Sequence, residues 1–494
     1  MQMDNETPQK RQPKPEQMED EPSSWLDRFL RIVSVTACGL LLFVAGAIVT
    51  TGEIFPGPQI AAAYEGGRAL YDKIVNYQNV YNTDLWYPQR SNKRGVTAYL
   101  PGKAQEGLTL YTSGDGPAAY LIDMKGRIVH QWRRPFSTLW PNGPRGKLWQ
   151  AGAQTVSKPQ PDPFVYFRHA HVFPNGDLLA LYEGAGDTPY GYGLAKLDKN
   201  SNVIWSYAGR AHHQFDIGPD GKIYVLTHEY SKERVKPYGH LKPPRLDDYL
   251  VILSPDGKEL EKIHLMKALG ASPYRQLGYS VSSFSVAEPL HANAVKYITS
   301  EMAANFAFAR EGQILLSFRD LGTGTVAVLD PGTKQISWAT NGPWIGQHDP
   351  DILANGNILL FDNFGNFHRP EGQTRILEFN PRTMETVWQY AGTADHPLES
   401  PIRGEQQRLA NGNTLIDEST AGRLVEVTRD GEIVWEFLNP ARGGDDGDKI
   451  AIFGWAQRLS PSDIDPAMLE KPGPTKQPDK KQQDKKQPDK ETRT

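Results

Sequence analysis

The central part of the chain repeats one short pattern six times. Each unit has a polar residue followed by glycine at the start of an apolar run: Glu106-Gly107, Asn175-Gly176, Asp220-Gly221, Glu311-Gly312, Asn355-Gly356 and Asn411-Gly412. A later apolar run, which ends in tryptophan in five of the six units, is found at Ile128–Trp132, Val203–Trp205, Lys262–His264, Ile336–Trp338, Val387–Trp388 and Ile433–Trp435. Asn-Gly and Asp-Gly between apolar runs are strong hairpin signals, so the repeat predicts antiparallel strands.

Six units of about four strands each predict an all-β fold, a six-bladed β-propeller over residues 95–465. A four-stranded sheet alone leaves both faces open to water, whereas packing against its neighbours in a ring covers both. The 46 glycines and 38 prolines agree with many turns. An open series of β-sandwiches is the alternative architecture.

An uncharged segment of membrane-spanning length precedes the repeats. Residues 32–51 carry no charged side chain, and about 20 apolar residues cross a bilayer as a helix. We therefore predict one transmembrane signal anchor over residues 26–53, with a cleaved signal peptide as the alternative. Arg28 and Arg31 precede the segment, so the positive-inside rule predicts a single-pass inner-membrane protein with a cytoplasmic N-terminus and a periplasmic propeller.

The remaining segments are predicted from their composition. Residues 1–25 are expected to be a disordered cytoplasmic N-terminus, residues 54–94 a neck, and residues 466–494 a disordered charged tail, because both termini have little to bury. The only cysteine, Cys38, lies in the apolar segment, which excludes an intramolecular disulfide, a thiolate zinc site and an iron–sulfur cluster. A net charge of -4 provides no basic footprint, so no nucleic-acid partner is expected.

The repeat register predicts that polar side chains gather at one end of the ring. Positions eight residues before and seven residues after each turn glycine are equivalent, and in a propeller they lie at the same end of the barrel. Residues at or near these positions include Tyr99, His213, His228, Arg319 and His348, together with His291 in the unit that carries an insertion, and His171 near the same rim. Histidines at matched positions predict a shared functional site.

Three kinds of chemistry are open for this cluster. The histidines could bind a metal with Glu183 or Asp216, act as acid–base catalysts, or include a nucleophile beside an anion-binding group. Arg319 favours the last, because a guanidinium pairs with sulfate or phosphate oxygens and is rarely found beside a metal ion. For any single histidine, a structural hydrogen bond within a strand is the alternative.

The order of these motifs resembles that of the arylsulfate sulfotransferase family of bacterial periplasmic propellers, over most of residues 105–440. The motifs are His213 ahead of Asp216, His291-x-Asn293, Ser317-Phe318-Arg319, and Gln347-His348-Asp349 ahead of Asn355-Gly356. Family members are secreted enzymes with a disulfide and an N-terminal strand domain. This chain differs, because it has one cysteine and an apolar anchor segment.

The resemblance implies a nucleotide-independent, ping-pong transfer of a sulfuryl group from an aryl sulfate to a phenol. It implies that His291 attacks the sulfur to form a sulfohistidine, and that another imidazole protonates the leaving phenolate. His213, Arg319 and His348 would hold the sulfuryl oxygens, and Asn293 would contact the sulfate. The remaining predicted substrate residues are His228, His171 and Tyr99, with Tyr190, Tyr192 and Trp344 as further candidates for stacking on the aryl ring.

The expected partners are small-molecule aryl sulfates and phenols, with no cofactor and no metal, and a homodimer is left open. Two other functions also remain open. One is a non-catalytic propeller that binds sulfated or anionic ligands or acts as a scaffold. The other is a metal-dependent propeller hydrolase.

Overall fold

The computed structural model describes residues 24–52, 54–57, 79–141, 147–150, 153–156, 160–187, 190–282, 285–365 and 374–466. Its internal contacts divide the chain into two units, Met1–Ala69 with Gln150–Gly152, and Leu70–Trp149 with Ala153–Thr494. Nearly all of the predicted disordered termini, and most of the predicted neck, lie outside the described residues.

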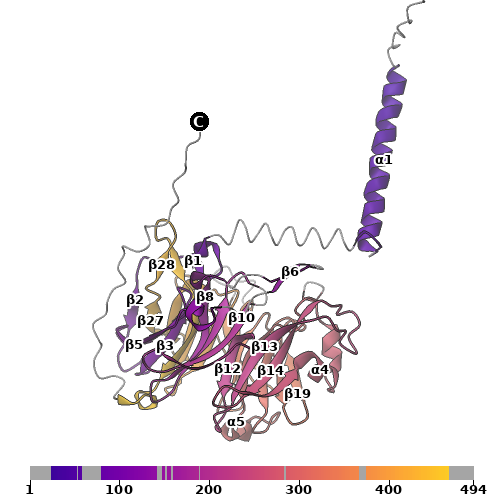
Figure 1. The fold of residues 1–494 in the computed structure, drawn as a ribbon. Coiled ribbons are helices and arrows are strands. Elements are labelled where there is room, and N and C mark those ends of the chain that lie inside the picture. Colours follow the sequence, from indigo (N-terminus) through magenta and orange to yellow (C-terminus); the bar gives the residue numbers. More distant parts are fainter. Residues whose placement is uncertain are drawn as a thin grey trace, which may run out of the picture. The chain divides into compact units, whose positions relative to one another are not determined.

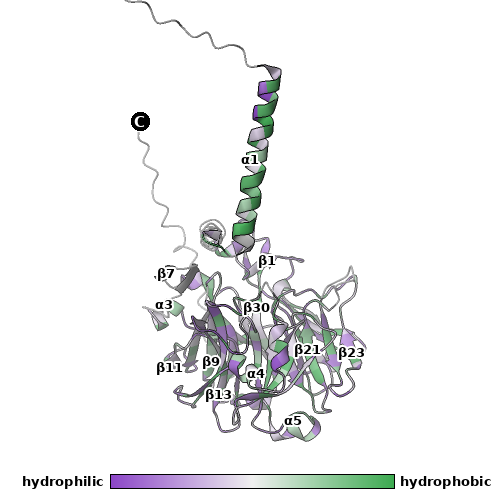
Figure 2. Ribbon diagram, turned by 90° about the vertical axis from the view of Figure 1, so that its right-hand side faces the viewer, coloured by the Kyte–Doolittle hydropathy of each residue, from purple (hydrophilic) through white to green (hydrophobic). Residues whose placement is uncertain are grey.

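The described part of the first unit contains one long helix, α1 (Trp25–Thr51). A capping box starts it: the Asp27 N–H donates to Oγ of Ser24, and the Ser24 N–H donates to the Asp27 carboxylate, both at 3.2 Å. The stretch Trp25–Val49 is mostly hydrophobic (green in Figure 2) and is long enough to cross a bilayer. The apolar helix predicted from the sequence is confirmed, and it is the one such helix among the described residues.

The second unit contains six antiparallel sheets of four or more strands in its described residues, five with four strands and one with five (Figure 1). Sheet 1 consists of β30 (Phe453–Leu459), β3 (Leu108–Ser113), β4 (Ala118–Ile122) and β5 (Ile128–Arg133). Sheet 2 consists of β8 (Val165–Val172), β9 (Leu178–Gly184), β10 (Gly191–Leu197) and β11 (Val203–Tyr207). Sheet 3 consists of β12 (Ala211–Ile217), β13 (Ile223–Ser231), β14 (Arg245–Leu253) and β15 (Glu259–His264).

The other three sheets follow in chain order. Sheet 4 consists of β16 (Ala292–Tyr297), β17 (Ile314–Phe318), β18 (Thr325–Asp330) and β19 (Gln335–Asn341). Sheet 5 consists of β20 (His348–Ile352), β21 (Ile358–Asp362), β22 (Arg375–Phe379) and β23 (Thr386–Tyr390). Sheet 6 consists of β24 (Glu405–Arg408), β25 (Thr414–Glu418), β26 (Arg423–Val427), β27 (Ile433–Leu438) and β2 (Gly95–Tyr99).

The innermost strands of these sheets contact one another in a closed ring, in the order β30, β8, β12, β16, β20 and β24. Each sheet therefore packs against the next, and the sixth packs against the first through β24 and β30. Large apolar side chains fill the space between neighbouring sheets. This arrangement is a β-propeller, and the predicted fold class is confirmed.

The tryptophans of the repeat tie one sheet to the next. Nε1 of Trp132 in β5 donates to the Gly176 carbonyl in the β8–β9 turn, and Nε1 of Trp435 in β27 donates to the Met124 carbonyl in the β4–β5 turn, both at 3.0 Å. Both indole rings are fully buried. The recurring tryptophan thus places a donor where a buried turn carbonyl of the neighbouring sheet needs one.

The structure differs from the predicted register in the first of the six sequence repeats, which forms sheet 1. Its innermost strand is β30 from the C-terminal end of the chain, so counting back from Glu106-Gly107 does not lead to an inner strand. Tyr99 instead ends β2, the outermost strand of sheet 6, where it pairs with Trp435. Its hydroxyl donates to Oε1 of Glu106 at 2.6 Å. The count failed because the ring is closed by a strand that is distant in sequence.

Short elements connect and extend the sheets. β1 (Trp86–Pro88), within the predicted neck, forms a three-stranded sheet with β29 (Lys449–Ala451) and β28 (Arg442–Gly443), while β6 (Lys147–Gln150) pairs with β7 (Ala153–Val156). The short helices are α3 (Phe136–Leu139), α4 (Leu265–Gly270) and α5 (Ser300–Asn305), with the 3-10 turns η1 (Val80–Asn82), η2 (Asp162–Phe164), η3 (Arg275–Tyr279), η4 (Ser419–Ala421) and η5 (Pro461–Asp463).

Candidate active site

Three of the predicted histidines meet where the inner strands begin. The ring centroid of His213 lies 5.1 Å from that of His291 and 6.4 Å from that of His348. All three residues are buried. They come from sheets 3, 4 and 5, so only the closed ring brings them together.

A bulge at the start of each of these strands sets the direction of its histidine. His213 and His291 have positive φ angles of 55° and 46°, and Asp349, directly after His348, has a φ of 49°. The strand register shifts at each place, between Ala211 and Phe215, between Ala292 and Ala294, and between His348 and Asp351. Positive φ angles are costly for residues other than glycine and often mark functional sites, and bulges re-aim side chains.

The proton position on His348 follows from its neighbours. Nδ2 of Asn363 donates to the carbonyls of Ser400 and Arg403, both at 2.7 Å, which turns Oδ1 towards the imidazole. Nδ1 of His348 lies 2.7 Å from that oxygen and 3.2 Å from the Gly346 carbonyl. Because both neighbours are acceptors, Nδ1 carries the proton and Nε2 keeps its lone pair. Burial holds the pKa of His348 well below its usual range, although the Asn363 bond opposes this shift.

His291 has a different environment. Its Nδ1 lies 3.1 Å from Oε2 of Glu288 and 3.2 Å from Nη2 of Arg319. The contact with Glu288 favours a proton on Nδ1, whereas the contact with Arg319 favours a proton on Nε2, so these two neighbours select neither tautomer. Burial disfavours the charge of Glu288, but His291 and the hydroxyl of Tyr190 lower the pKa of this carboxyl to about 2.

Arg319 supplies the fixed positive charge of the site. Its Nε donates to Oδ1 of Asp320 at 2.9 Å, and its side chain remains 29% exposed. Burial opposes its charge, but Asp320 raises the pKa of Arg319 above its usual value. A guanidinium that is partly open to solvent and lies beside an imidazole can receive an anionic oxygen.

The groups that hold His213 in place were not part of the predicted site, except Glu183, which was considered as a metal ligand. Its backbone N–H donates to Oε1 of Glu183 at 2.5 Å, and the Tyr166 hydroxyl donates to Oε2 of the same carboxylate at 2.9 Å. Its Nδ1 lies 2.8 Å from Nδ1 of His212. Burial, together with His291 and His212, holds the pKa of His213 well below its usual range. Glu183 is therefore a positioning group, and Asp216 likewise accepts from the Tyr297 and Ile217 N–H groups.

Tyr190 covers the cluster. Its ring centroid lies 5.5 Å from His213 and 6.0 Å from His291, and its hydroxyl donates to Oε1 of Glu288 at 2.7 Å. The other aromatic candidates are engaged in the fold, since the Tyr192 hydroxyl donates to Asp187 and Nε1 of Trp344 donates to the Gly324 carbonyl.

The remaining predicted substrate residues lie outside this cluster or support it. Asn293 donates from Nδ2 to the Gln347 carbonyl at 2.8 Å and so holds the start of β20. Arg168 on β8 is the residue eight positions before the turn glycine Gly176. His171 lies three residues further, about 10 Å along the strand, and lines a cavity of about 240 Å³ in the middle of the ring with Asp216 and Lys296. Tyr99 is on an outer strand.

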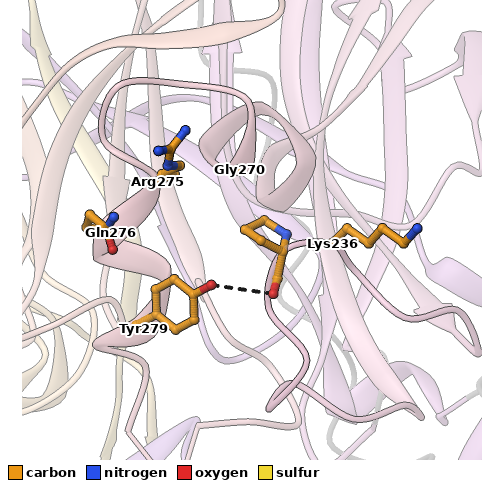
Figure 3. A pocket seen from close by; sticks show the side chains of 6 residues that line it. Lys236, Gly270, Arg275, Gln276 and Tyr279 are labelled. Atoms are coloured by element: carbon orange, nitrogen blue, oxygen red, sulfur yellow. Dashed lines mark hydrogen bonds between the residues drawn. The ribbon is translucent and has the colours of Figure 1, made fainter.

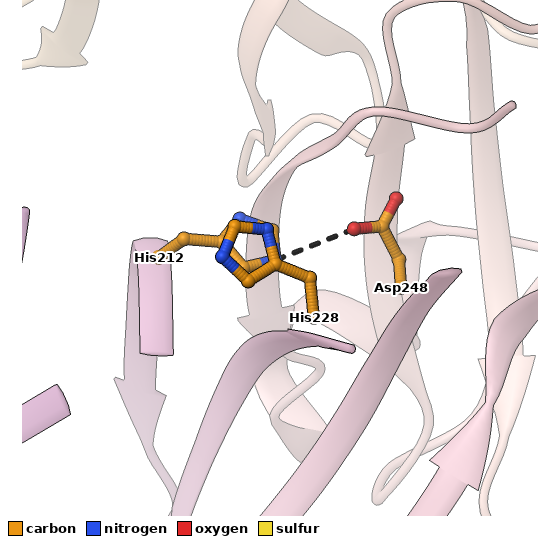
Figure 4. Close-up of side chains that lie close together, drawn as sticks. All are labelled: His212, His228 and Asp248. Carbon is orange, nitrogen blue, oxygen red and sulfur yellow. Dashed lines mark ion pairs between the residues drawn. The ribbon is translucent and has the colours of Figure 1, made fainter. Parts of the chain in front are cut away.

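His228 belongs to a second buried group behind the cluster, with His212 and Asp248 (Figure 4). Their nearest potential ligand atoms all lie within 4.8 Å of one another. However, the two imidazoles stack at 4.4 Å with an interplanar angle of 23°, and the Gly191 N–H donates to Nε2 of His228 at 3.2 Å. Nε2 of His228 is therefore already an acceptor, which leaves Nδ1 as the nitrogen of this ring that could bind a metal ion.

A separate hollow lies at the insertion between sheets 3 and 4. It has a volume of about 530 Å³ and is lined by Lys236, Pro237, Gly270, Arg275, Gln276 and Tyr279 (Figure 3). None of these residues belongs to the predicted site. The histidine cluster therefore remains the best candidate for chemistry.

One known protein family matches this chain over much of its length. The profile described as Arylsulfotransferase (ASST) matches residues 169–440, more than half of the chain. The chain belongs to the arylsulfotransferase family. The resemblance predicted from the motifs is confirmed, and the matched range contains the whole histidine cluster together with Arg319. No curated protein sequence matches the chain significantly.

Solved structures with a similar fold share little sequence with this family member. A protein of unknown function from Bacteroides caccae is 14% identical, over 67% of this chain and 94% of that chain, with a TM-score of 0.40. The Cps50 (Swd1) β-propeller domain of Myceliophteria thermophila is 10% identical, over 75% and 99% of the two chains, with a TM-score of 0.37. A functionally unknown protein from Desulfotomaculum acetoxidans is 10% identical, over 67% and 95%, with a TM-score of 0.34.

Sequence reasoning did not single out Glu288, His212 or Asp248. Glu288 and His291 lie in an insertion, where the repeat register provides no equivalent position. His212 has a sequence signal, since it directly precedes His213, but alternation along a strand predicts that neighbouring side chains point to opposite faces. The bulge in β12 breaks that alternation and brings both imidazoles together.

Proposed function

We propose that this protein is a membrane-anchored aryl sulfotransferase, which moves a sulfuryl group from an aryl sulfate to a phenol through a sulfohistidine. The observation that carries the proposal is the meeting of His213, His291 and His348 beside Arg319. A nucleophilic imidazole beside fixed positive donors suits an anionic group that passes through a transition state with spreading negative charge.

The contacts favour His348 as the nucleophile, which differs from the role that the resemblance implies for His291. Asn363 and Gly346 hold the proton of His348 on Nδ1, and burial keeps the ring neutral, so Nε2 has a free lone pair. His291 contacts both a carboxylate and a guanidinium through Nδ1, and these two contacts favour opposite tautomers. With Arg319 as the donor to Nδ1, Nε2–H of His291 can donate to a sulfuryl oxygen, whereas both neighbours of His348 leave its Nε2 lone pair free.

The proposed reaction has two steps. In the first, Nε2 of His348 forms a bond to sulfur while the bond from sulfur to the aryl oxygen breaks, and the departing phenolate takes a proton from a second imidazole. In the second, an acceptor phenol attacks the sulfur, the nitrogen–sulfur bond breaks, and the phenolic proton returns to that imidazole. Arg319 and Nε2–H of His291 bind the sulfuryl oxygens in both steps.

Helix α1 supports the proposed location. Arg28 and Arg31 lie at its N-terminal end, and the positive-inside rule favours a cytoplasmic N-terminus with a periplasmic site. A periplasmic site would take its sulfuryl group from an aryl sulfate and would need no nucleotide sulfate donor.

The test uses p-nitrophenyl sulfate as donor and phenol as acceptor. We expect release of p-nitrophenol, formation of phenyl sulfate, and a sulfuryl group on His348 after acid-free digestion and mass spectrometry. His348→Ala should form neither product, whereas a sulfohistidine at position 291 would return the nucleophile role to His291. Free sulfate without phenyl sulfate would indicate a hydrolase, and binding of the donor without turnover would indicate a non-catalytic binding protein.

A further inference from the structure

The proposed transfer needs a group that gives up a proton in one step and takes it back in the next. Inside a protein this group must change its protonation without leaving an unpaired charge, because an isolated buried charge is costly. Nδ1 of His291 lies 3.1 Å from Glu288 and 3.2 Å from Arg319, so it contacts two charged groups rather than a neutral ring with which it could exchange a proton.

His213 begins a chain of contacts that leads away from the cluster. Its Nδ1 lies 2.8 Å from Nδ1 of His212, and Nε2 of His212 lies 3.4 Å from Oδ1 of Asp248. A contact between two ring nitrogens at this distance requires a proton on one and a lone pair on the other. The proton positions on His213 and His212 are therefore linked.

The end of this series of contacts that lies away from His213 is closed to solvent. His212 is fully buried, Asp248 is 2% exposed, and the stacked ring of His228 covers one face of His212 (Figure 4). Nε2 of His212 and Oδ1 of Asp248 have no other hydrogen-bond partner among the described residues and lie 3.4 Å apart. The second oxygen, Oδ2, accepts from the Ala292 N–H at 2.9 Å, which fixes the carboxylate beside the start of β16.

We infer that Asp248, His212 and His213 form a proton relay that makes His213 the acid–base residue of the proposed sulfuryl transfer. In the protonated state, Asp248 donates O–H to Nε2 of His212, whose Nδ1–H donates to Nδ1 of His213, and Nε2–H of His213 faces the aryl oxygen. His213 is the catalytic residue, and His212 and Asp248 are positioning residues. The inference rests on the proposed function and adds the route of its proton.

The proton balance is complete in each step. When the phenolate leaves, it takes the Nε2 proton of His213, the Nδ1 proton of His212 moves to Nδ1 of His213, and the Asp248 proton moves to Nε2 of His212. Asp248 is left as a carboxylate, and both imidazoles are neutral. The acceptor phenol reverses every transfer. No imidazolium persists, which agrees with the burial of His213 and with a pKa of Asp248 that burial raises above its usual value.

The test compares Asp248→Asn and His212→Gln with the wild type, using the full chain purified in detergent. Asparagine keeps an oxygen for the Ala292 N–H but cannot end a proton relay. The first release of p-nitrophenol should persist in both variants, because p-nitrophenolate is a good leaving group that needs little protonation. Turnover of phenyl sulfate as donor, and transfer to phenol, should fall by about 10²–10⁴-fold, the range of general acid–base catalysis. Asp248→Glu should restore part of the loss.

His264→Gln is the matched control. Nε2 of His264 in β15 lies 3.3 Å from Asp247, the residue next to Asp248 on β14, so this substitution breaks a similar contact without touching the relay. Its rates should equal those of the wild type. The relay would be overturned if Asp248→Asn and His212→Gln fold normally and their transfer rates fall by less than about threefold with both donors. A wild type without a p-nitrophenol burst and without sulfohistidine would instead overturn the proposed function.

A measurement on the wild-type enzyme tests the relay independently of whether the variants fold. In mixtures of H₂O and D₂O, transfer of several protons in one step gives a curved dependence of rate on deuterium content, whereas transfer of one proton gives a straight line. We expect a curve with phenyl sulfate as donor. A straight line would overturn the relay.

Discussion

Nδ1 of His348 lies 2.7 Å from Oδ1 of Asn363, a residue just beyond the neighbouring strand β21. The amide of Asn363 is itself held by two backbone carbonyls, so the direction of this hydrogen bond is determined by the fold. The contact selects the tautomer with a free Nε2 and uses a neutral partner, which leaves the imidazole uncharged.

Asn363→Asp should change the pH dependence of the reaction. A carboxylate next to Nδ1 would raise the pKa of His348 by about 1–3 units, so the imidazole would be protonated, and not nucleophilic, at pH values below the new pKa. The acidic limb of the pH–rate profile should move to higher pH, with wild-type rates approached in base. The exposed-turn variant Asn200→Asp should leave the profile unchanged. An unaltered profile in Asn363→Asp would rule out His348 as the nucleophile.

Arg319→Ala should reduce kcat strongly. Removal of one preorganised donor to a developing charge costs about 10²–10³-fold in rate. Arg319→Lys should recover part of this loss, because lysine keeps the charge but lacks the planar pair of donors. Steady-state kinetics with p-nitrophenyl sulfate measure both effects, and Arg310→Ala, whose side chain is 72% exposed, provides the control. Equal kcat in Arg319→Ala and wild type would remove Arg319 from the site.

Glu288→Gln should weaken the hold on His291 without changing the route of the proton. We expect a fall in kcat/KM of about tenfold, the scale of one lost charge-assisted hydrogen bond. Because the pKa of Glu288 is about 2, its charge is constant above pH 4, and the pH profile should keep its shape. Donors with good and poor leaving groups should be affected alike. A selective loss with phenyl sulfate would instead assign proton transfer to His291 and Glu288.

Trp435→Ala should destabilise the propeller. The fully buried indole donates to the Met124 carbonyl, and the Arg458 guanidinium lies 4.8 Å from its ring. Loss of such a side chain costs about 3–5 kcal/mol. Trp388→Ala, at a partly exposed equivalent position that donates to the Arg429 carbonyl, should cost clearly less. Denaturant unfolding followed by tryptophan fluorescence measures the difference, and equal losses would contradict a special role for Trp435 where sheets 6 and 1 meet.

The double variant Leu40→Arg and Leu41→Arg should lose its membrane attachment. Each arginine near the centre of a spanning helix costs about 2.5–3.5 kcal/mol of insertion free energy. The wild type should remain in the membrane fraction after an alkaline carbonate wash, and the variant should be released. The conservative pair Leu40→Ile and Leu41→Ile should behave as the wild type. Release of the wild-type chain would indicate that α1 acts as a cleaved signal rather than an anchor.

Much of the site could be predicted from residue positions because repeats convert sequence register into spatial position. His213 and His348 lie at equivalent places before turn glycines, and the structure brings their rings within 6.4 Å. The same count misplaced Tyr99, because the first sheet takes its inner strand from the other end of the chain. His171, which was expected near the same rim, lines the cavity in the middle of the ring together with Asp216 and Lys296.

The sequence alone determined the local and periodic features of this protein: an apolar helix of membrane-spanning length, hairpins marked by polar-glycine turns, recurring tryptophans and the order of the family motifs. These features depend on neighbours along the chain. Only the tertiary structure decided which nitrogen of His348 carries the proton, that Glu288 lies beside His291, and that His212 and Asp248 stand behind His213. Those relationships depend on bulges that break strand alternation and on contacts between sheets, which neither spacing nor composition records.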